Sequence, residues 1–326
     1  MRVFDSRWKG THGIGRFAAE LHARLPEFQS IAISGRPSSP RDPWILRSYL
    51  LRAAPELFLS PGYNAPAGSP CAFVFCIHDL NHLFVRENSS PLKRAYYEYV
   101  IRPAARRARR VLTVSDFSRR AICEWAGIAE RNVINVGNGV SAAFKPGGES
   151  PRTTAPYFLH VGNHRPHKNF ARVLQAFALS DLAGDFALVS TGTPSEDLLA
   201  EIGRLGLSRR VVFVGNVSDD QLAGLYRAAT ALVLVSLYEG FGLPIIEAMS
   251  CGTPVLTSDA AAMPEVAGDA AMLVDPYDVE AIAEAMKKLA SDTSLRASLR
   301  MRGLQHARQY SWDAVAERVR HALCGI

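Results

Sequence analysis

Residues 231–252, ALVLVSLYEGFGLPIIEAMSCG, pass from five apolar residues through a turn with two glycines into a helical pattern. The run ALVLV has the length of a buried strand, and Pro244 suits the first turn of a helix, where its missing N–H loses no hydrogen bond. Gly240 and Gly242 let the intervening backbone approach a ligand closely. The segment therefore predicts a strand, a ligand-binding loop and a helix, the repeating unit of parallel α/β sheets.

Two carboxylates flank this glycine loop. Glu239 precedes it, and Glu247 lies one turn into the helix. The backbone amides from Phe241 to Leu243 are expected to point outward at the helix N-terminus, which attracts phosphate and sugar oxygens. Acidic side chains around such a loop suit the recognition of hydroxyl groups. For Glu247 alone, the alternative is that its charge only complements the helix dipole.

The alternation of short β-branched runs and helical patterns extends along the whole chain. In the first half it predicts strands at 3–5, 31–34, 57–60, 72–77, 111–114 and 133–136, and helices at 15–25 and 92–107. In the second half it predicts strands at 157–161, 186–190, 211–214, 231–235, 254–257 and 272–274, and helices at 170–179, 196–205, 219–228, 244–250 and 279–289. The halves therefore look like one parallel α/β architecture used twice.

The length of 326 residues exceeds what one hydrophobic core usually serves, so two domains are expected. Turn-forming residues cluster at 145–156, KPGGESPRTTAP, which is the predicted joint. We expect domains at 1–145 and 146–310, followed by a C-terminal helix within 311–326 that returns to the first domain. In open parallel sheets ligands bind beyond the carboxyl ends of the strands, so the loops there are the candidate site.

Composition limits the location and the partners. No apolar run approaches the roughly 20 residues of a transmembrane helix, and the N-terminus does not read as a signal peptide. The five cysteines are odd in number and form no C-x-x-C pair, which favours free thiols in the cytoplasm. Net charge is +6, and the run from Arg102 to Arg110, RPAARRARR, holds five arginines and no acid. This run suits nucleotide, nucleic-acid or membrane phosphate, or is a solvated helix face.

A second motif, VGNHRPHKN at residues 161–169, begins where the first strand of the second half ends. Arg165 and Lys168 can both reach one diphosphate, with arginine as a fork and lysine as a point charge. His164 and His167 are expected to be bystanders, because no three histidines share a spacing that would hold a metal ion.

A third motif, HGIGR at residues 12–16, follows the first strand. Gly13, Gly15 and Ala18 satisfy G-x-G-x-x-A, the dinucleotide fingerprint. An NAD enzyme should carry an acid about 20 residues further on. The chain has Arg36 near that place, which could accept a 2′-phosphate, so an NADP enzyme stays open.

The pair His78 and Asp79 directly follows the predicted strand at 72–77. A histidine beside a carboxylate suggests general base catalysis. We expect Asp79 instead to cap the next turn.

Residues 239–247, EGFGLPIIE, resemble the E-x7-E signature of retaining GT-B glycosyltransferases of family 4. The other motifs stand at matching places, so the resemblance covers residues 1 to about 310. It implies an α/β fold of the GT-B type, with two Rossmann-like domains whose parallel sheets face a central cleft. The first domain would serve the acceptor side and the second the nucleotide sugar. The first domain is short for the family.

The resemblance also implies roles for individual residues. Glu239 and His78 would contact the donor sugar, Arg165 and Lys168 would bind the diphosphate and stabilise its departing charge, and Glu247 would bind the ribose. The donor site would further include Gly13, Gly15, Gly162, Asn163, Gly215, Gly240, Phe241, Gly242 and Leu243.

The reaction implied is transfer of a hexose from a nucleoside diphosphate sugar with retention of configuration, without a metal and without another cofactor. The pattern looks most like mannosyl- and rhamnosyltransferases of surface polysaccharide assembly, which suggests a GDP-linked donor. A lipid-linked glycan is the expected acceptor. The Arg102 to Arg110 run would then hold the protein at the inner membrane surface.

Three alternatives remain at this point. One is an NADP-dependent oxidoreductase built on the loop from His12 to Ala18. Another is a nucleic-acid-binding protein that uses the arginine run, although the run lacks interleaved aromatic residues and leaves residues 239–247 unexplained. The third is a catalytically inactive scaffold, although every motif residue that the family uses is present.

Overall fold

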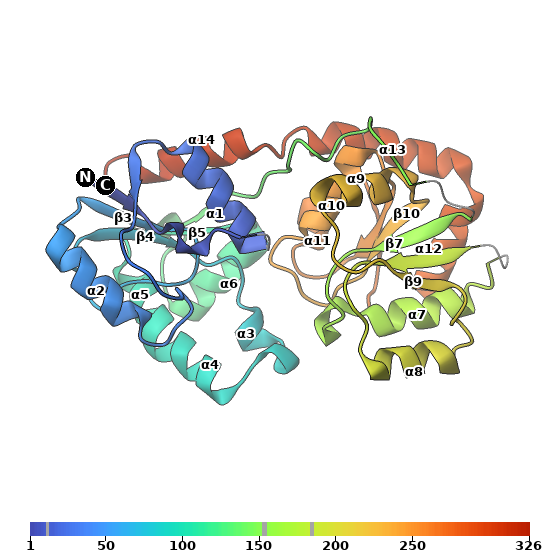
Figure 1. The fold of residues 1–326 in the computed structure, drawn as a ribbon, viewed down its shortest axis with the longest axis horizontal. Helices are drawn as coiled ribbons and strands as arrows, with labels where there is room; N and C mark the ends of the chain where they lie inside the picture. Colours follow the sequence, from blue (N-terminus) through green and yellow to red (C-terminus); the bar gives the residue numbers. More distant parts are fainter. Residues whose placement is uncertain (11–12, 152–154, 183–185) are drawn as a thin grey trace. The chain divides into compact units, whose positions relative to one another are not determined.

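The computed structural model describes residues 1–10, 13–151, 155–182 and 186–326. The chain divides into two compact units, Met1–Gly139 with Tyr310–Ile326, and Val140–Gln309. Within the described ranges, each unit contains one sheet of six strands, all parallel (Figure 1). The C-terminal helix α14 (Trp312–Leu323) belongs to the first unit, where it contacts α1.

The sheet of the first unit has the order β2-β1-β3-β4-β5-β6. Its strands are β1 (Arg2–Phe4), β2 (Phe28–Ser30), β3 (Leu57–Ser60), β4 (Ala72–Cys76), β5 (Arg110–Thr113) and β6 (Val133–Asn135). The strand order reverses at β1, which lies between β2 and β3. In such sheets the crevice beyond the carboxyl ends at the reversal is the usual place for a ligand.

The helices of the first unit cover the sheet and close its core. They include α1 (Gly13–Arg24), α2 (Asp42–Ala53), α3 (Asn81–Phe84), α4 (Pro91–Tyr96), α5 (Arg102–Arg107) and α6 (Asp116–Ala126). Leu46 and Leu50 of α2, Ala104 of α5 and Ile122 of α6 pack into one buried cluster with strand residues such as Phe58. Shared packing in this cluster places α2, α5 and α6 on the same face of the sheet.

Two predicted elements of this unit need correction. The second strand is β2, at Phe28–Ser30, and not 31–34, because its register is set by β1, where Arg2 pairs with Phe28. The helix expected at 92–107 is interrupted between α4 and α5 by a π-helical segment, η3 (Tyr97–Ile101). Pro103 in the first turn of α5 has no N–H to donate to the preceding turn, which favours such a break.

The sheet of the second unit has the order β12-β11-β10-β7-β8-β9. Its strands are β7 (Tyr157–His160), β8 (Ala187–Ser190), β9 (Val211–Phe213), β10 (Ala231–Leu234), β11 (Val255–Ser258) and β12 (Met272–Val274). Counted from β7, this is the 3-2-1-4-5-6 order of dinucleotide-binding sheets. The reversal lies between β7 and β10, which pair directly.

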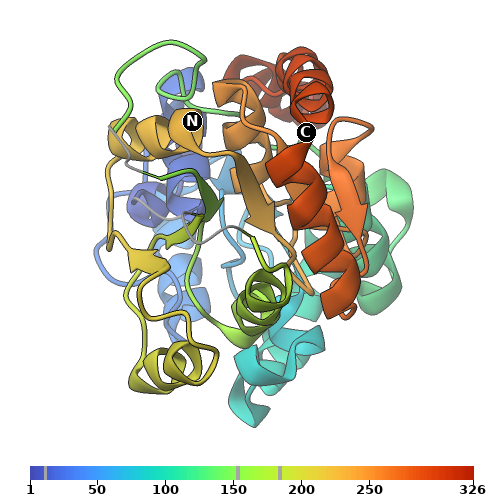
Figure 2. The ribbon, with the colours of Figure 1, turned by 90° about the vertical axis from the view of Figure 1, so that its right-hand side faces the viewer.

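Helices lie on both sides of this second sheet (Figure 2). They are α7 (Phe170–Leu179), α8 (Glu196–Arg204), α9 (Asp219–Ala228), α10 (Leu243–Cys251), α11 (Met263–Ala267), α12 (Val279–Ser291) and α13 (Thr293–Ala307). Val173 of α7, Ile202 of α8 and Met286 of α12 share one buried cluster. In the described part of the chain, no helix is both long and apolar enough to cross a membrane.

Candidate active site

The two strongest sequence motifs meet at the strand reversal of the second unit. The 161–169 loop leaves the carboxyl end of β7, and the glycine loop leaves the carboxyl end of the neighbouring β10. Two hydrogen bonds join them, one between backbone groups and one from the Asn169 side chain. The Leu237 N–H donates to the His167 carbonyl at 2.7 Å, and the Asn169 amide group donates to Val235 O at 3.0 Å. The fold therefore fixes both loops in one place.

Lys168 and Glu239 form an ion pair across these two loops. Their side chains are 16% and 15% exposed, so the pair is largely shielded but reachable from solvent. Ser236, at the end of β10, donates from Oγ to Glu239 Oε1 at 3.0 Å. Arg165 is exposed and precedes the short helix η5 (Pro166–Lys168) that carries Lys168. The site thus holds two cations and one oriented carboxylate.

The glycine loop enters α10 with the conformation that its sequence requires. Gly242 caps the helix at φ +93°, a left-handed conformation that favours glycine, and Leu243 begins the helix. Gly240 and Phe241 are buried beside it. Glu247, in α10, is buried and accepts a hydrogen bond from the Tyr226 hydroxyl at 3.0 Å. The helix dipole acts most strongly in the first turn of α10, and Glu247 lies beyond that turn. A role as a buried hydrogen-bonding group therefore suits Glu247 better than a role in complementing the dipole.

Gly162, Asn163 and Gly215 lie in loops beyond the carboxyl ends of β7 and β9. The Gly162 N–H donates to Thr191 Oγ1 at 3.0 Å, and Asn163 accepts from the Arg165 N–H through its side chain at 3.4 Å. The Gly215 carbonyl accepts from Gly192 N at 2.8 Å. Val214 and Val217, on either side of the Gly215 turn, line a cavity of about 1020 Å³ beside α9.

Two histidines, one at the end of β7 and one in the 161–169 loop, share hydrogen bonds with Ser190 at the end of β8. His160 Nδ1 and His164 Nε2 lie 3.1 Å and 2.9 Å from the Ser190 hydroxyl oxygen. His160 is fully buried, and its Nε2 has no partner among the described residues, which fits a neutral ring that donates from Nδ1. Burial, with His164 and Lys168 nearby, lowers the pKa of His160 to about 3.

The pKa of His160 predicts a pH dependence of stability. In the unfolded chain His160 takes up a proton as pH falls below its ordinary pKa of 6.5, whereas in the folded chain it does so only near pH 3. The stability that the neutral ring contributes is therefore fully present above pH 6.5 and is lost as pH falls toward 3. The slope from this group is about 1.4 kcal/mol per pH unit. Hydrogen exchange of the β7 amides measures it. His160→Asn should flatten the slope, whereas the exposed His321→Asn should leave it unchanged; equal slopes in all three proteins would contradict the prediction.

In the first unit, Gly13 and Gly15 stand in the first turn of α1, while His12 lies outside the described residues. Gly15 is buried, and a Cβ there would lie 2.6 Å from the Gly10 backbone. Close packing of the helix on the preceding loop therefore requires glycine at residue 15.

His78 follows β4, as predicted, and is held on two sides. Its Nε2 lies 2.9 Å from the Pro61 carbonyl, so the ring donates there. The ring also meets the edge of Phe17 at a centroid distance of 4.8 Å. Asp79 accepts from the Asn81 N–H at 2.9 Å, so it caps the turn into α3 as expected. Since Pro61 belongs to the loop that follows β3, this loop orients the His78 ring.

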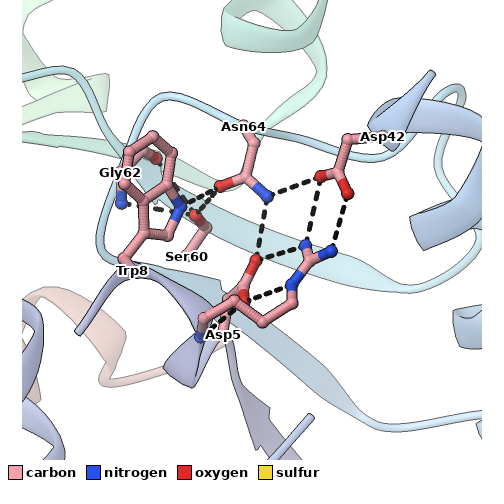
Figure 3. A network of polar contacts seen from close by, with 7 residues as sticks. Asp5, Trp8, Asp42, Ser60, Gly62 and Asn64 are labelled. Carbon is pink, nitrogen blue, oxygen red and sulfur yellow. Dashed lines mark hydrogen bonds and ion pairs between the residues drawn. The ribbon is translucent and has the colours of Figure 1, made fainter. Parts of the chain in front are cut away.

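A buried polar network at the strand reversal of the first unit was not predicted by any sequence pattern (Figure 3). Arg7 makes ion pairs of 2.7 Å with both Asp5 and Asp42. The Asn64 amide group donates to the same two carboxylates at 2.8 Å. The network ties the loop after β1 to the loop after β3 and to the start of α2, so it fixes the segment that includes Pro61.

Among the described residues, no three histidine, cysteine, aspartate or glutamate side chains converge closely enough to hold a metal ion.

Known proteins resemble this chain in sequence and in fold. The family described as Glycosyltransferase Family 4 matches residues 3–144, and Glycosyl transferases group 1 matches residues 144–306. O-antigen chain mannosyltransferase B of Escherichia coli is 33% identical over 290 residues, covering 84% of this chain and 74% of that protein. Serotype-specific mannosyltransferase WbdA of Escherichia coli is 29% identical over 275 residues, which cover 78% of this chain and 33% of that protein.

The solved structure of WaaG, a glycosyltransferase involved in lipopolysaccharide biosynthesis, has a TM-score of 0.78 over 100% of both chains at 17% identity. At that identity the likeness concerns the fold, and it agrees with the two parallel sheets described above. The chain belongs to the glycosyltransferases of the group 1 and family 4 type, with the GT-B fold.

Proposed function

We propose that this glycosyltransferase moves mannose, or a deoxyhexose such as rhamnose, from a GDP-sugar to a hydroxyl of a lipid-linked glycan. The observation that carries the proposal is the meeting of Lys168 and Glu239 at the strand reversal of the second unit. O-antigen chain mannosyltransferase B, whose name states that it transfers mannose, supports mannose and a role in surface polysaccharide assembly. The sugar transfer would take place at the cytoplasmic face of a membrane.

The donor would lie across the carboxyl ends of β7 and β10. Lys168 and the exposed Arg165 would bind the diphosphate, since both are cationic and Arg165 offers a planar fork. Release of Glu239 from Lys168 would leave its carboxylate, still held by Ser236, to accept hydrogen bonds from sugar hydroxyls. The Glu247 carboxylate, oriented by Tyr226, suits the ribose hydroxyls. His78 is expected to contact the donor sugar.

The proposed chemistry is attack of the acceptor hydroxyl on the anomeric carbon from the side of the departing diphosphate. The bond from the anomeric carbon to the phosphate oxygen breaks, the bond to the acceptor oxygen forms, and the acceptor proton passes to the diphosphate. Configuration is therefore retained. The protein contributes orientation and charge stabilisation, with Arg165 and Lys168 opposite the growing negative charge.

Metal independence follows from this assignment, because two protein cations neutralise the leaving group. Turnover should therefore be unchanged in excess chelator. The measurement is initial rate with and without chelator, followed by addition of Mg²⁺ or Mn²⁺. A rate that falls with chelator and returns with either ion would contradict this.

The test of the proposed function is a screen of nucleotide sugars for binding, by thermal shift, and for transfer to a lipid-linked acceptor. GDP-mannose or a GDP-deoxyhexose should stabilise the protein and serve as donor, and magnetic resonance of the product should show the donor's anomeric configuration. Stabilisation by NADP alone would favour the oxidoreductase alternative. An inverted product would reject the retaining mechanism and leave the donor assignment standing.

A further inference from the structure

Among the helices of the first unit, large apolar side chains are exposed on α2, on the continuous segment α4–η3 and, at Phe84, on α3. Trp44, Ile45 and Leu51 of α2 are 58%, 43% and 55% exposed. Leu92 of α4 and Tyr99 of η3 are 72% and 79% exposed. In the second unit the exposed apolar residues stand singly on separate elements, such as Leu199 on α8 and Met301 on α13, which is ordinary for a protein surface.

Helix α2 and the segment α4–η3 cover the same face of the first sheet. Leu46 and Leu50 on the inner side of α2 pack in one cluster with Tyr97 and Ile101 of η3. The Tyr63 ring lies 6.1 Å from the Tyr97 ring of η3, and the adjacent Asn64 donates to Asp42 of α2 at 2.8 Å, which places η3 near the start of α2. Their outer sides therefore form one surface, called here the α2–α4 face: Trp44, Ile45, Leu51, Leu92 and Tyr99.

Basic side chains interleave with this face. On α2, Trp44 and Leu51 lie two turns apart on one stripe, with Arg47 and Arg52 exposed on its two sides. Lys93 and Arg94 are exposed next to Leu92 on α4. The acid of α2, Asp42, is buried and paired with Arg7, so it contributes no exposed negative charge.

The fold uses basic side chains of both regions: Arg47 and Arg52 of α2 and Lys93 and Arg94 of α4 donate hydrogen bonds to neighbouring residues. Members of the arginine run at 102–110 do the same. Arg102 pairs with Glu98, and the Arg106 side chain donates to the Ala126 carbonyl at 2.7 Å. Arg107 and Arg109 remain exposed at the other end of the helix. The run alone therefore offers less free charge than its sequence indicates, and it offers no apolar side chain to insert.

We propose that the α2–α4 face docks on an anionic lipid bilayer, which deepens the proposed function by giving the route to a lipid-linked acceptor. Tryptophan and tyrosine favour the membrane interface, and isoleucine and leucine insert among acyl chains. Arginine and lysine bury their aliphatic stems and reach lipid phosphate with their charged ends. Nucleic acid would match the charges but would leave the exposed leucine and isoleucine side chains without a partner.

Docking by this face would bring the ligand-binding edge of the first sheet close to the bilayer. Asp42, the first residue of α2, pairs with Arg7, in the segment that leaves the carboxyl end of β1. Trp44 and Ile45 therefore stand at the carboxyl edge of the sheet. His78, after β4, and Gly13, which begins α1 after β1, lie at the same edge. A lipid-anchored acceptor would meet this edge within the plane of the membrane surface.

The experiment is flotation of the full chain with vesicles of phosphatidylcholine, alone and with phosphatidylglycerol, in the absence of donor and acceptor. Wild type should bind only the anionic vesicles. Trp44→Ser with Leu51→Ser should bind about tenfold more weakly, and so should Arg47→Gln with Arg52→Gln. Leu179→Ser with Leu199→Ser, an exposed apolar pair of the second unit, is the matched control and should bind like wild type. Emission from Trp44 should shift to shorter wavelength on binding.

Wild-type binding by the Trp44 and Leu51 double variant would overturn the proposal, and so would equal binding to neutral and anionic vesicles. Loss of binding only when Arg107 and Arg109 become glutamine would assign the contact to the arginine run and reject the α2–α4 face. An assay of sugar transfer to a soluble acceptor distinguishes a failure of this proposal from a failure of the proposed function. The double variant should keep that activity, whereas an error in the donor assignment would remove it from wild type as well.

Discussion

Glu239→Ala is expected to lower turnover by about a hundred- to a thousandfold while the chain stays folded, the size of effect seen when a preorganised electrostatic contact to a transition state is lost. Glu239 is held by Lys168 and Ser236 at the strand reversal, so its carboxylate is already oriented before the donor binds. Removing it takes away a sugar contact and leaves Lys168 without its ion-pair partner. The measurement is kcat with saturating donor.

The matched control for this variant is another glutamate of the second unit that pairs with a lysine. Glu284, exposed on α12, lies 2.8 Å from Lys287. Glu284→Ala should keep wild-type turnover, because an exposed ion pair contributes little to stability and lies outside the site. Turnover of Glu239→Ala close to wild type, with the protein folded, would show that Glu239 does not contact the reacting sugar.

Arg7→Met should lower the free energy of unfolding of the first unit by about 3–5 kcal/mol, because it leaves Asp5 and Asp42 buried without their cation. Both carboxylates are at most 1% exposed, and only Arg7 and Asn64 reach both of them in the network described. The change is measured by urea unfolding followed through tryptophan fluorescence. All four tryptophans of the chain lie in the first unit, so this signal reports that unit alone.

Arg36→Met provides the control, since Arg36 is exposed in the same unit. It should unfold at the same urea concentration as wild type. Equal midpoints for Arg7→Met and Arg36→Met would contradict the role of Arg7 as the cation that compensates the two buried aspartates.

Much of the fold could be predicted because strand signals are local. Apolar runs bounded by turn residues placed every strand within one residue of its observed ends, β2 excepted. Helices α7 and α9 have the predicted bounds, and α14 lies within the predicted range 311–326. Periodic apolar residues along these helices face a sheet that the same run of sequence helps to build, so local pattern and final packing agree.

The misses have physical reasons of their own. Helix α2 exposes Trp44, Ile45 and Leu51, so its apolar residues do not lie on one side and no helical period appears. Helix α13 buries only a few residues, among them Leu299 and Gly303, which again gives a weak pattern. The boundary of β2 depends on its register with β1, which is a contact between distant parts of the chain.

The candidate site shows the same division between local and distant information. Its residue types and loops were readable from the motifs, including Arg165, Lys168 and Glu239. The ion pair between Lys168 and Glu239 was not readable, because it depends on β7 and β10 being neighbours although two strands separate them in sequence. Tyr226 and Ser190 were missed for that reason too, since each acts through a partner far away in the chain.

The most direct test of the central claim is the affinity for GDP, measured by titration calorimetry, of wild type, Lys168→Ala and Lys287→Ala. A diphosphate held at the β7–β10 edge predicts that Lys168→Ala binds GDP at least about tenfold more weakly, which corresponds to about 1.4 kcal/mol. Lys287, partly exposed on α12, is the matched lysine, and its replacement should leave the affinity unchanged. Equal affinity in all three proteins would contradict the placement of the donor at this edge.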